Sequence, residues 1–533
     1  MRIPILIVGA GPAGLTSSIL LSRLGVRSLT VERHAATSTH PKATGISTRT
    51  MELFRHWRIE ARVRTNEIRA VFSSSHRPTL SGPELETRSL GYPTREDAAV
   101  FSPTWPAVLA QDALEPILLD YARSFDEAEV RFATELVDLE QTPGGVRASL
   151  VDHKSGERYV VHARYLLAAD GANSPIRRRL GIGVSGVECI GQYLSILFRA
   201  DIDAIVGPNR HGLYMLHGVG GPAPTVVVPT SNDNRWLIAT PWRGDARPAP
   251  TLSSADLVAI VRQAAGCSDL AVDLIDHQLV EIGAGVAERF RQGSVFLVGD
   301  AAHRTAPTGG TGMNTAIHAA HNLAWKLAAV LQGTGGDALL DTYEPERRPS
   351  GERNVLRSLG KLQGVSGVAS DLGVVYASHA VIADGEPERP AVIEPTGPAC
   401  VGARLPHLSI ECETAVCSTL DLVGEGLVLI TGDAGRPAWS DAVRAVSNGL
   451  GLPLGVVTVS PASDAVARWF DAVGIESEGA VLVRPDGHIA WRSVSAAAEP
   501  VATLERVLSR VLCTDVGTRR ASGWWPADDR RCA

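Results

Sequence analysis

The chain begins with hydrophobic residues that scarcely alternate with polar ones. Residues 2–8 form an almost unbroken apolar run with β-branched side chains, which predicts a strand buried on both faces of a parallel sheet. A glycine-rich turn at 9–14 and a helical stretch at 15–24 follow. A second short apolar run at 26–31 predicts another strand, which ends at Glu32. This order of strand, turn, helix and strand is typical of a parallel α/β sheet.

Three later regions repeat the apolar signal in different forms. Residues 165–168 and 295–298 predict further buried strands, and a helix is expected from 315 to about 331. Between them lies a region of strand-like stretches followed by one helical stretch, which predicts a second domain. These stretches are 193–200, 225–229 and 235–240 for the strands, and 254–265 for the helix.

The C-terminal part predicts a smaller domain of its own. Apolar arms on either side of Pro485-Asp486-Gly487 indicate a hairpin over residues 481–492. The other expected elements alternate as strand, helix, strand, helix and strand, which suggests a thioredoxin-like fold. They are 426–430, 440–446, 453–459, 465–473 and 480–483. Without a Cys-x-x-Cys pair this domain is not expected to perform dithiol chemistry.

Composition narrows the class of protein. The chain has 533 residues, 44% of them hydrophobic and 20% charged, which is ordinary for a globular protein. A net charge of −7 without a dense Lys/Arg run argues against nucleic acid or an anionic membrane as a partner. No apolar run reaches membrane-spanning length, and the first one is too short for a signal peptide. Seven scattered cysteines suggest reduced thiols and a cytoplasmic location.

The turn after the first strand is a dinucleotide fingerprint, G-x-G-x-x-G. One glycine makes the tight turn, one lets a pyrophosphate approach the backbone, and one lets helix and strand pack closely. The helix start offers N–H donors to the phosphates. Glu32 can accept from ribose hydroxyls and would repel a 2′-phosphate, so NADP is not expected here. The predicted contacts are Gly9, Gly11, Pro12, Ala13, Gly14, Glu32 and, nearby, Arg33 and Lys42.

A second nucleotide-type motif follows the strand at 295–298. Asp300 stands at the strand end, where it can accept from sugar-like hydroxyls, and a Gly-rich turn then opens a helix. NAD does not need such an element far from the first, whereas the ribityl chain and ring of FAD extend beyond its ADP half. The helix start would favour negative charge on a reduced flavin. The residues concerned are Asp300, Pro307, Gly310, Gly312, Met313 and Asn314.

These motifs resemble those of the FAD-dependent aromatic hydroxylases, the para-hydroxybenzoate hydroxylase-like flavoprotein monooxygenases. The resemblance rests on segments that occur in the family's order: Q-D-A-L-E-P-I-L (111–118), A-D-G-A-N-S-P-I-R (169–177), G-D-A-A-H…P-x-G-G-x-G-M-N…N-L-A-W-K-L (299–327) and Y-E-P-E-R-R-P (343–349). It adds Gln111 and Asp170 to the expected FAD contacts. Lys42 stands where the family usually has Arg, which keeps the charge but loses the bidentate fork.

The resemblance implies an enzyme that binds FAD, uses NAD(P)H transiently, and hydroxylates an aromatic compound with O₂ through a C4a-hydroperoxyflavin. The C-terminal domain resembles that of larger members acting on phenols and aromatic polyketides, so a polyketide-like or other secondary-metabolite substrate is expected. Baeyer–Villiger oxygenation, non-oxygenating redox chemistry and a non-catalytic FAD- or ligand-binding role stay open. A monomer or homodimer is expected.

In this family a sheet forms the wall opposite the flavin, with the substrate between them. Tyr214, His217, Arg235 and Trp236, with Trp242 and Arg243, are the candidates for substrate contact. Of these, His217 and Arg235 are candidates for activating a phenol. No metal site is expected, because no carboxylate completes a set with His303, His318 and His321.

The predicted fold class is α/β: a Rossmann-like FAD-binding domain with an inserted β-sheet substrate domain, plus a C-terminal thioredoxin-like domain. The expected boundaries are 1–180 and 286–370 for the two parts of the FAD-binding domain, 181–285 for the substrate domain, 371–398 for a linker, 399–515 for the thioredoxin-like domain and 516–533 for a tail.

Overall fold

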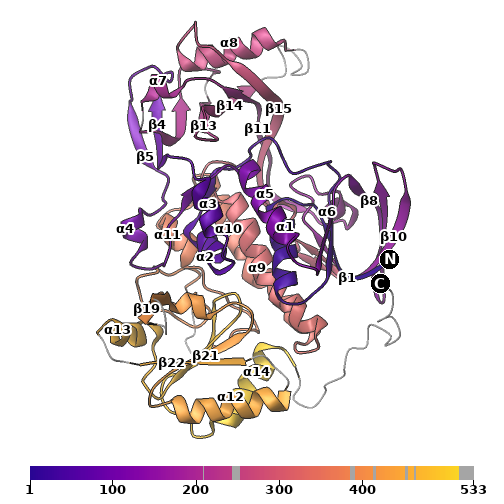
Figure 1. Cartoon of the computed structure of the whole chain (residues 1–533), viewed down its shortest axis with the longest axis vertical. Helices are drawn as coiled ribbons and strands as arrows, with labels where there is room; N and C mark the ends of the chain where they lie inside the picture. The colour runs from indigo at the N-terminus through magenta and orange to yellow at the C-terminus, as the bar shows by residue number, and fades with distance from the viewer. Residues whose placement is uncertain are drawn as a thin grey trace.

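A computed structural model describes residues 1–207, 209–221, 223–242, 252–383, 390–411, 416–450, 454–460 and 464–514. Three bodies follow one another along the longest axis of the molecule (Figure 1). The body that carries β1 and α9 lies in the middle, between a sheet covered by α8 and the C-terminal body with α12 and α14. Within the described ranges, no helix has both the length and the apolar character needed to cross a membrane.

The central body is built on a mostly parallel sheet. Its strand order is β16-β17-β10-β1-β2-β7, with β9 pairing antiparallel to β10, and β8 pairing with β9. The strands are β1 (Arg2–Val8), β2 (Ser28–Val31), β7 (Ala128–Arg131), β8 (Thr134–Thr142), β9 (Gly145–Asp152), β10 (Arg158–Ala168), β16 (Arg291–Gln292) and β17 (Val295–Leu297). β1 coincides with the predicted apolar run, and it is paired in parallel on both sides, with β10 and with β2.

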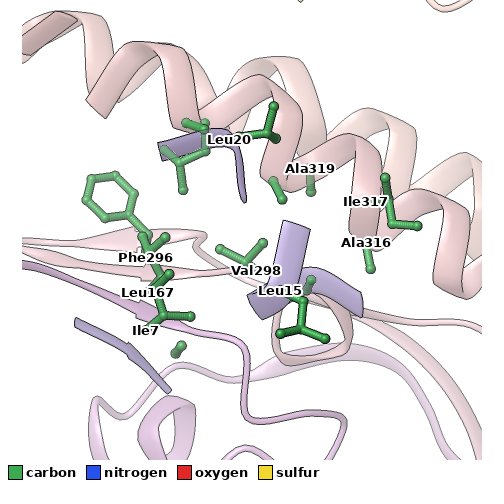
Figure 2. Packing of buried hydrophobic residues seen from close by; sticks show 14 of the residues in the cluster. Ile7, Leu15, Leu20, Leu167, Phe296, Val298, Ala316, Ile317 and Ala319 are labelled. Atoms are coloured by element: carbon green, nitrogen blue, oxygen red, sulfur yellow. The ribbon is translucent and has the colours of Figure 1, made fainter. Parts of the chain in front are cut away.

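Helices pack on this sheet through a continuous apolar core. The two that carry the nucleotide motifs are α1 (Pro12–Arg23) and α9 (Gly312–Leu331), which contact each other. Figure 2 shows side chains of both helices packed together with Ile7, Leu167 and Phe296 of the sheet. The remaining helices of this body are α2 (Thr48–His56), α3 (Glu60–Thr65), α5 (Gln111–Ala122), α6 (Pro175–Arg179), α10 (Tyr343–Ser358) and α11 (Gly367–Leu372); short strands β3 (Gly45–Ile46) and β6 (Ala107–Val108) pair with each other.

Two glycines let the start of α1 lie close to the backbone of the sheet. Gly9 has a φ of +107°, and a Cβ built on it would lie 2.2 Å from the carbonyl oxygen of Ala169. A Cβ on Gly14 would lie 1.8 Å from the carbonyl oxygen of Gly9. A side chain at either position would therefore push α1 away from the strand ends that it caps.

The second body is a sheet of order β18-β15-β11-β14-β13-β12-β4-β5. Its strands are β4 (Val71–Arg77), β5 (Glu86–Ser89), β11 (Val184–Arg199), β12 (His211–Leu216), β13 (Thr225–Pro229), β14 (Arg235–Trp242), β15 (Asp273–Ala287) and β18 (His303–Arg304); α7 (Asp203–Val206) and α8 (Ser254–Ala265) accompany them. The short helix α4 (Arg95–Ala98) packs instead against α11 of the central body. The structure differs here from the expected boundaries of 181–285, because residues 71–89 extend this sheet. β4 pairs in parallel with β12, which only long-range folding could reveal.

The C-terminal body contains a sheet of order β22-β21-β23-β24, in which β21 and β22 are parallel and the other pairs antiparallel. This is the thioredoxin-like arrangement that the sequence predicts. Helices α12 and α14 pack on one face and α13 on the other. The elements are β19 (Ser409–Glu411), β20 (Val416–Ser418), β21 (Leu427–Gly432), α12 (Arg436–Leu450), β22 (Leu454–Val459), α13 (Asp464–Val473), β23 (Ala480–Val483), β24 (Ile489–Ser493) and α14 (Pro500–Val511).

A buried cluster of charges joins the C-terminal body to the central one. Arg484, at the start of the predicted hairpin turn, donates to both carboxylate oxygens of Glu346 on α10, at 2.6 and 2.7 Å. Lys326 of α9 donates to the same carboxylate at 2.7 Å, and Arg484 also contacts Asp486. These side chains are essentially inaccessible to solvent. Burial acts to raise the pKa of Glu346, but Arg484 and Lys326 hold it well below its ordinary value.

Replacing Arg484 by Met should destabilise the whole chain, because two buried carboxylates would then share one ammonium group. We expect the free energy of unfolding to fall by about 3–5 kcal/mol, measured by denaturant titration. The control is Arg444→Met, which removes an exposed partner of Asp441 in the same domain and should have little effect. Equal stability of the two variants would contradict the assigned role.

Candidate active site

One large cavity lies between the central sheet and the second sheet. Its volume is about 1470 Å³, which exceeds the ~300–1,000 Å³ of an ordinary small-molecule pocket. Residues that follow β1, β2, β10 and β17 all line it. Because these strands are parallel, their carboxyl ends meet at one edge of the sheet. The two sequence motifs, nearly 300 residues apart, therefore face the same space.

The first turn of α1 presents an open anion site to the cavity. Gly11 is the N-cap residue, no side chain caps the helix, and no acidic residue lies in its first turn. A Cβ on Gly11 would meet nothing within 4 Å, so this glycine faces the open cavity. The unpaired N–H groups and the positive end of the helix dipole can therefore bind phosphate. Gly9, Pro12 and Ala13 line the cavity too, whereas Gly14 lies behind them against Gly9.

Glu32 is held in place at the end of β2. Its Oε2 accepts from the Ala10 N–H at 3.0 Å, and its Oε1 accepts from the His34 N–H at 2.9 Å. The carboxylate lines the cavity beside the glycine turn, where a ribose would lie next to a bound pyrophosphate. Arg33 is exposed and borders the same space. This arrangement agrees with the geometry expected of the dinucleotide fingerprint.

On α5, Gln111 is oriented by a second carboxylate. Its Nε2 donates to Glu115 Oε1 at 2.7 Å, and the Ser38 N–H donates to Glu115 Oε2 at 2.9 Å. Burial raises the pKa of Glu115. Both residues line the cavity together with Lys42, whose side chain is exposed to it. The sequence prediction missed Glu115, although its place four residues after Gln111 puts it on the same helix face.

Two aspartates from neighbouring strands approach the cavity with acceptor capacity left over. Asp170 accepts from the Ile176 N–H at 3.2 Å through Oδ2, while its Oδ1 is buried and has no hydrogen-bond partner in the described part of the chain. Burial raises the pKa of Asp170. Burial also raises the pKa of Asp300, against the opposing fields of Lys42 and Arg304. Hydroxyl groups of a ligand would satisfy both carboxyl groups.

The loop before α9 is fixed from behind. The Asn314 amide donates to the carbonyl oxygens of Gly45 and Gly310, both at 3.0 Å, and its oxygen accepts from the Ser47 N–H at 2.9 Å. Asn314 is buried and does not line the cavity, so it positions the loop and is not placed to touch a ligand. Pro307, Gly310, Gly312 and Met313 do line it.

The second sheet offers the cavity an apolar face. Along each strand, alternate residues point to the cavity and carry aliphatic side chains. They are Leu213, Met215, Val226, Val228, Leu237 and Ala239. Tyr193, Ser195 and Gln278 are polar positions of the same wall. Such a surface, mostly apolar with few polar groups, suits an aromatic compound.

The residues expected to contact substrate lie elsewhere. Tyr214 and Trp236 are fully buried on the opposite face of the sheet, in the core that α8 covers. A strand sends successive side chains to opposite faces, so their neighbours Leu213 and Leu237 face the cavity instead. Trp242 packs on the same covered core, and Arg243 lies outside the described residues.

The two candidates for phenol activation are also absent from the cavity lining. His217 is exposed, and its Nε2 lies 3.0 Å from the Nδ1 of His76. Arg235 forms a 2.7 Å ion pair with Asp112 of α5 and thereby ties the second sheet to the central body. Neither residue lines the cavity. Arg235 is on the same face of β14 as Leu237 and Ala239, but its guanidinium is held by Asp112 at the start of the strand, and His217 lies beyond the end of β12.

A buried histidine that the sequence prediction did not single out does line the cavity. His40, between β2 and β3, lies 2.8 Å from Ser195 Oγ through Nε2 and 3.0 Å from Asp276 Oδ2 through Nδ1. These residues are far apart in sequence, so no local motif could have indicated their meeting. Within the described residues, no cluster of three or more His, Cys, Asp or Glu side chains is arranged to hold a metal ion.

Comparison with known proteins covers nearly the whole chain. Residues 2–358 match the FAD binding domain family, and residues 399–514 match the aromatic-ring hydroxylase C-terminal family. A putative polyketide hydroxylase of Streptomyces halstedii is 38% identical, covering 96% of this chain and 97% of that protein. Aklavinone 12-hydroxylase RdmE of Streptomyces purpurascens is 37% identical, covering 96% and 99%.

Solved structures agree. Aklavinone-11 hydroxylase in a ternary complex with FAD and aklavinone superimposes with a TM-score of 0.86 at 36% identity, covering 96% of this chain and 99% of that one. The flavin-dependent monooxygenase PieE, in complex with FAD and substrate, gives a TM-score of 0.86 at 32% identity, covering 97% and 100%. Since this chain shares both domains and nearly its full length with such flavoenzymes, it belongs to the FAD-dependent aromatic-ring hydroxylases, monooxygenases whose cofactor is FAD.

Proposed function

We propose that this FAD-dependent monooxygenase hydroxylates a polycyclic aromatic substrate of the polyketide type, held against the apolar face of the second sheet. The observation that carries the proposal is the shared cavity: the two nucleotide turns and the aliphatic sheet face line one space. The volume of about 1470 Å³ supports two molecules side by side. The relatives that act on aklavinone and related polyketides favour the same class of substrate.

FAD fits the donors and acceptors of the cavity. We assign its pyrophosphate to the N-terminus of α1 at Gly11–Ala13, with Arg33 and Lys42 nearby, and its adenosine ribose to Glu32. Asp300 and the loop from Pro307 to Met313 would hold the ribityl chain and ring. Gln111 and the unpartnered oxygen of Asp170 complete the set of contacts. When bound, FAD accepts reducing equivalents from NAD(P)H and activates O₂.

The protein itself orients the substrate and excludes water. The aliphatic residues of the sheet face would hold the aromatic ring in a fixed orientation and keep water from the reacting centre. Because FAD occupies the dinucleotide fingerprint, we propose that NAD(P)H binds transiently and leaves before oxygen transfer. The thiols of Cys189, Cys267 and Cys513 support a reducing compartment, the cytoplasm.

Gly11→Val should weaken FAD binding without unfolding the protein, because a Cβ at this position meets no protein atom within 4 Å, while the side chain would fill the phosphate site. We expect a colourless purified protein with an unchanged circular dichroism spectrum and an FAD affinity reduced by about 100-fold, a loss of about 2.7 kcal/mol of binding free energy. The control Gly455→Val changes an exposed strand position of the C-terminal domain and should stay yellow. A yellow Gly11→Val protein would contradict the assigned site.

Ala239→Trp should weaken the binding of large substrates more than that of small ones, because the indole would occupy part of the cavity next to the second sheet. We expect binding of 1,2-dihydroxyanthraquinone, measured by quenching of flavin fluorescence, to weaken by about tenfold or more, equivalent to about 1.4 kcal/mol. Binding of catechol, a single ring, should change much less. Equal loss for both compounds would contradict the polycyclic assignment.

For the wild-type enzyme, NAD(P)H oxidation that yields no hydroxylated product with any polyphenol tested would contradict the proposed hydroxylation.

A further inference from the structure

A chain of hydrogen bonds crosses the wall of the cavity outside the FAD motifs. Ser195 lies on β11, Asp276 on β15, and His40 in the segment between β2 and β3. The imidazole bridges the other two, 2.8 Å from Ser195 Oγ and 3.0 Å from Asp276 Oδ2. All three residues line the cavity. The side chain of Asp276 is 46% exposed, whereas His40 and Ser195 are buried.

The chemistry of the groups fixes the direction of these hydrogen bonds. An ionised carboxylate can only accept, so Nδ1 of His40 carries the proton that Asp276 binds. Nε2 is then an acceptor and receives the hydroxyl proton of Ser195. The oxygen of Ser195 keeps lone pairs with which it can accept a proton from a ligand. This order allows a proton to pass from the ligand through Ser195 to His40.

The charges around His40 favour a neutral imidazole that can become positive. Burial lowers the pKa of His40, while Asp276 and Asp112 oppose this effect and Lys42 adds to it. Asp112 is itself paired with Arg235 at 2.7 Å. At neutral pH the imidazole is therefore a base, and the Asp276 carboxylate stands ready to stabilise the imidazolium.

We propose that Ser195, His40 and Asp276 form a proton relay that ionises a phenolic hydroxyl of the bound substrate. The relay rests on the proposed function, since it requires a phenol in the cavity. The phenolic O–H bond breaks, its electron pair stays on the substrate oxygen, and its proton passes to Ser195 Oγ. The hydroxyl proton of Ser195 moves to His40 Nε2 in the same step. The phenolate that results is a more electron-rich ring for oxygen transfer.

The same types of residue serve as nucleophile, base and orienting acid in acyl transfer, but the position of Ser195 disfavours that role. Ser195 lies in mid-strand, in register with Ala239 on one side and Gln278 on the other. Its backbone belongs to the sheet ladder on both sides, so there is no free pair of N–H groups to bind an oxyanion. A proton relay needs no such site.

The test follows the ionisation of a bound dye. 1,2-Dihydroxyanthraquinone changes its visible absorption when it loses a proton, so its apparent pKa can be titrated on the FAD-loaded full-length enzyme against the free dye. We expect the wild-type enzyme to lower this pKa by about one unit, and Ser195→Ala and His40→Asn to abolish the shift. Affinity for the dye at alkaline pH, where it is already ionised, should be unchanged. A merely structural role would instead weaken binding at every pH.

Turnover gives a second measurement. The substrate here is any phenol that the wild-type enzyme hydroxylates, and kcat should fall about 100-fold in Ser195→Ala. The acidic limb of the wild-type pH profile, where His40 becomes protonated, should disappear in His40→Asn. His217→Asn is the matched control, since His217 is a hydrogen-bonded histidine outside the cavity, and it should behave as wild type. Flavin content verifies that each variant is folded. If His40→Asn does not fold, Ser195→Ala alone still tests the relay.

The outcomes separate the relay from the proposed function. Wild-type ionisation of the dye in Ser195→Ala or His40→Asn, or loss of the shift in His217→Asn, would overturn the relay alone. Failure of the FAD-loaded wild-type enzyme to bind the dye would overturn the proposal that the cavity holds a polycyclic substrate, and the relay with it. A shift that only Ser195→Ala and His40→Asn lose supports the relay.

Discussion

The active site depends on one close backbone approach, at the point where α1 meets the end of β1. Gly14 lies against the carbonyl oxygen of Gly9, and Gly9 lies against that of Ala169, with no room for a Cβ at either contact. This contact brings the positive end of α1 to the edge where four parallel strands end. Glu32, Asp170 and Asp300 follow the other three strands and reach the same cavity. The cofactor site is thus a property of the sheet edge rather than of any single motif.

A feature of this site could be predicted from the sequence when the residues that determine it are close together along the chain. The glycine turns carry their conformational requirement in consecutive residues, so the contacts of Gly11, Glu32 and Asp300 with the cavity could be predicted from them. Asn314 was assigned to the ligand by its place in a motif, but the structure gives it to the carbonyl groups of Gly45 and Gly310. A motif shows that a residue is needed without showing on which side of the backbone it acts.

The cavity wall formed by the second sheet shows a different limit of prediction from sequence. Alternation along β12 and β14 indicates that Tyr214 and Trp236 point to the opposite face from Leu213 and Leu237, but it does not tell which face lines the cavity. That is decided by where α8 packs, and α8 covers the aromatic side. Large polar aromatics were therefore poor guides, and aliphatic residues form the wall. The contact between His40, Ser195 and Asp276 depends on tertiary folding alone, and no local sequence pattern indicates it.

The buried charges around Arg484 have a consequence for how such enzymes can diversify. Arg484 and Asp486 belong to the C-terminal domain, while Glu346 and Lys326 belong to the flavin-binding body. Each half holds one cation and one anion, and the two bonds from Arg484 to Glu346 join the halves. Recombination that exchanges one domain between relatives would leave a buried guanidinium or carboxylate without its partner across the boundary unless both Arg484 and Glu346 are retained. Domain shuffling at this boundary is thereby constrained, and the two domains are expected to evolve as one unit.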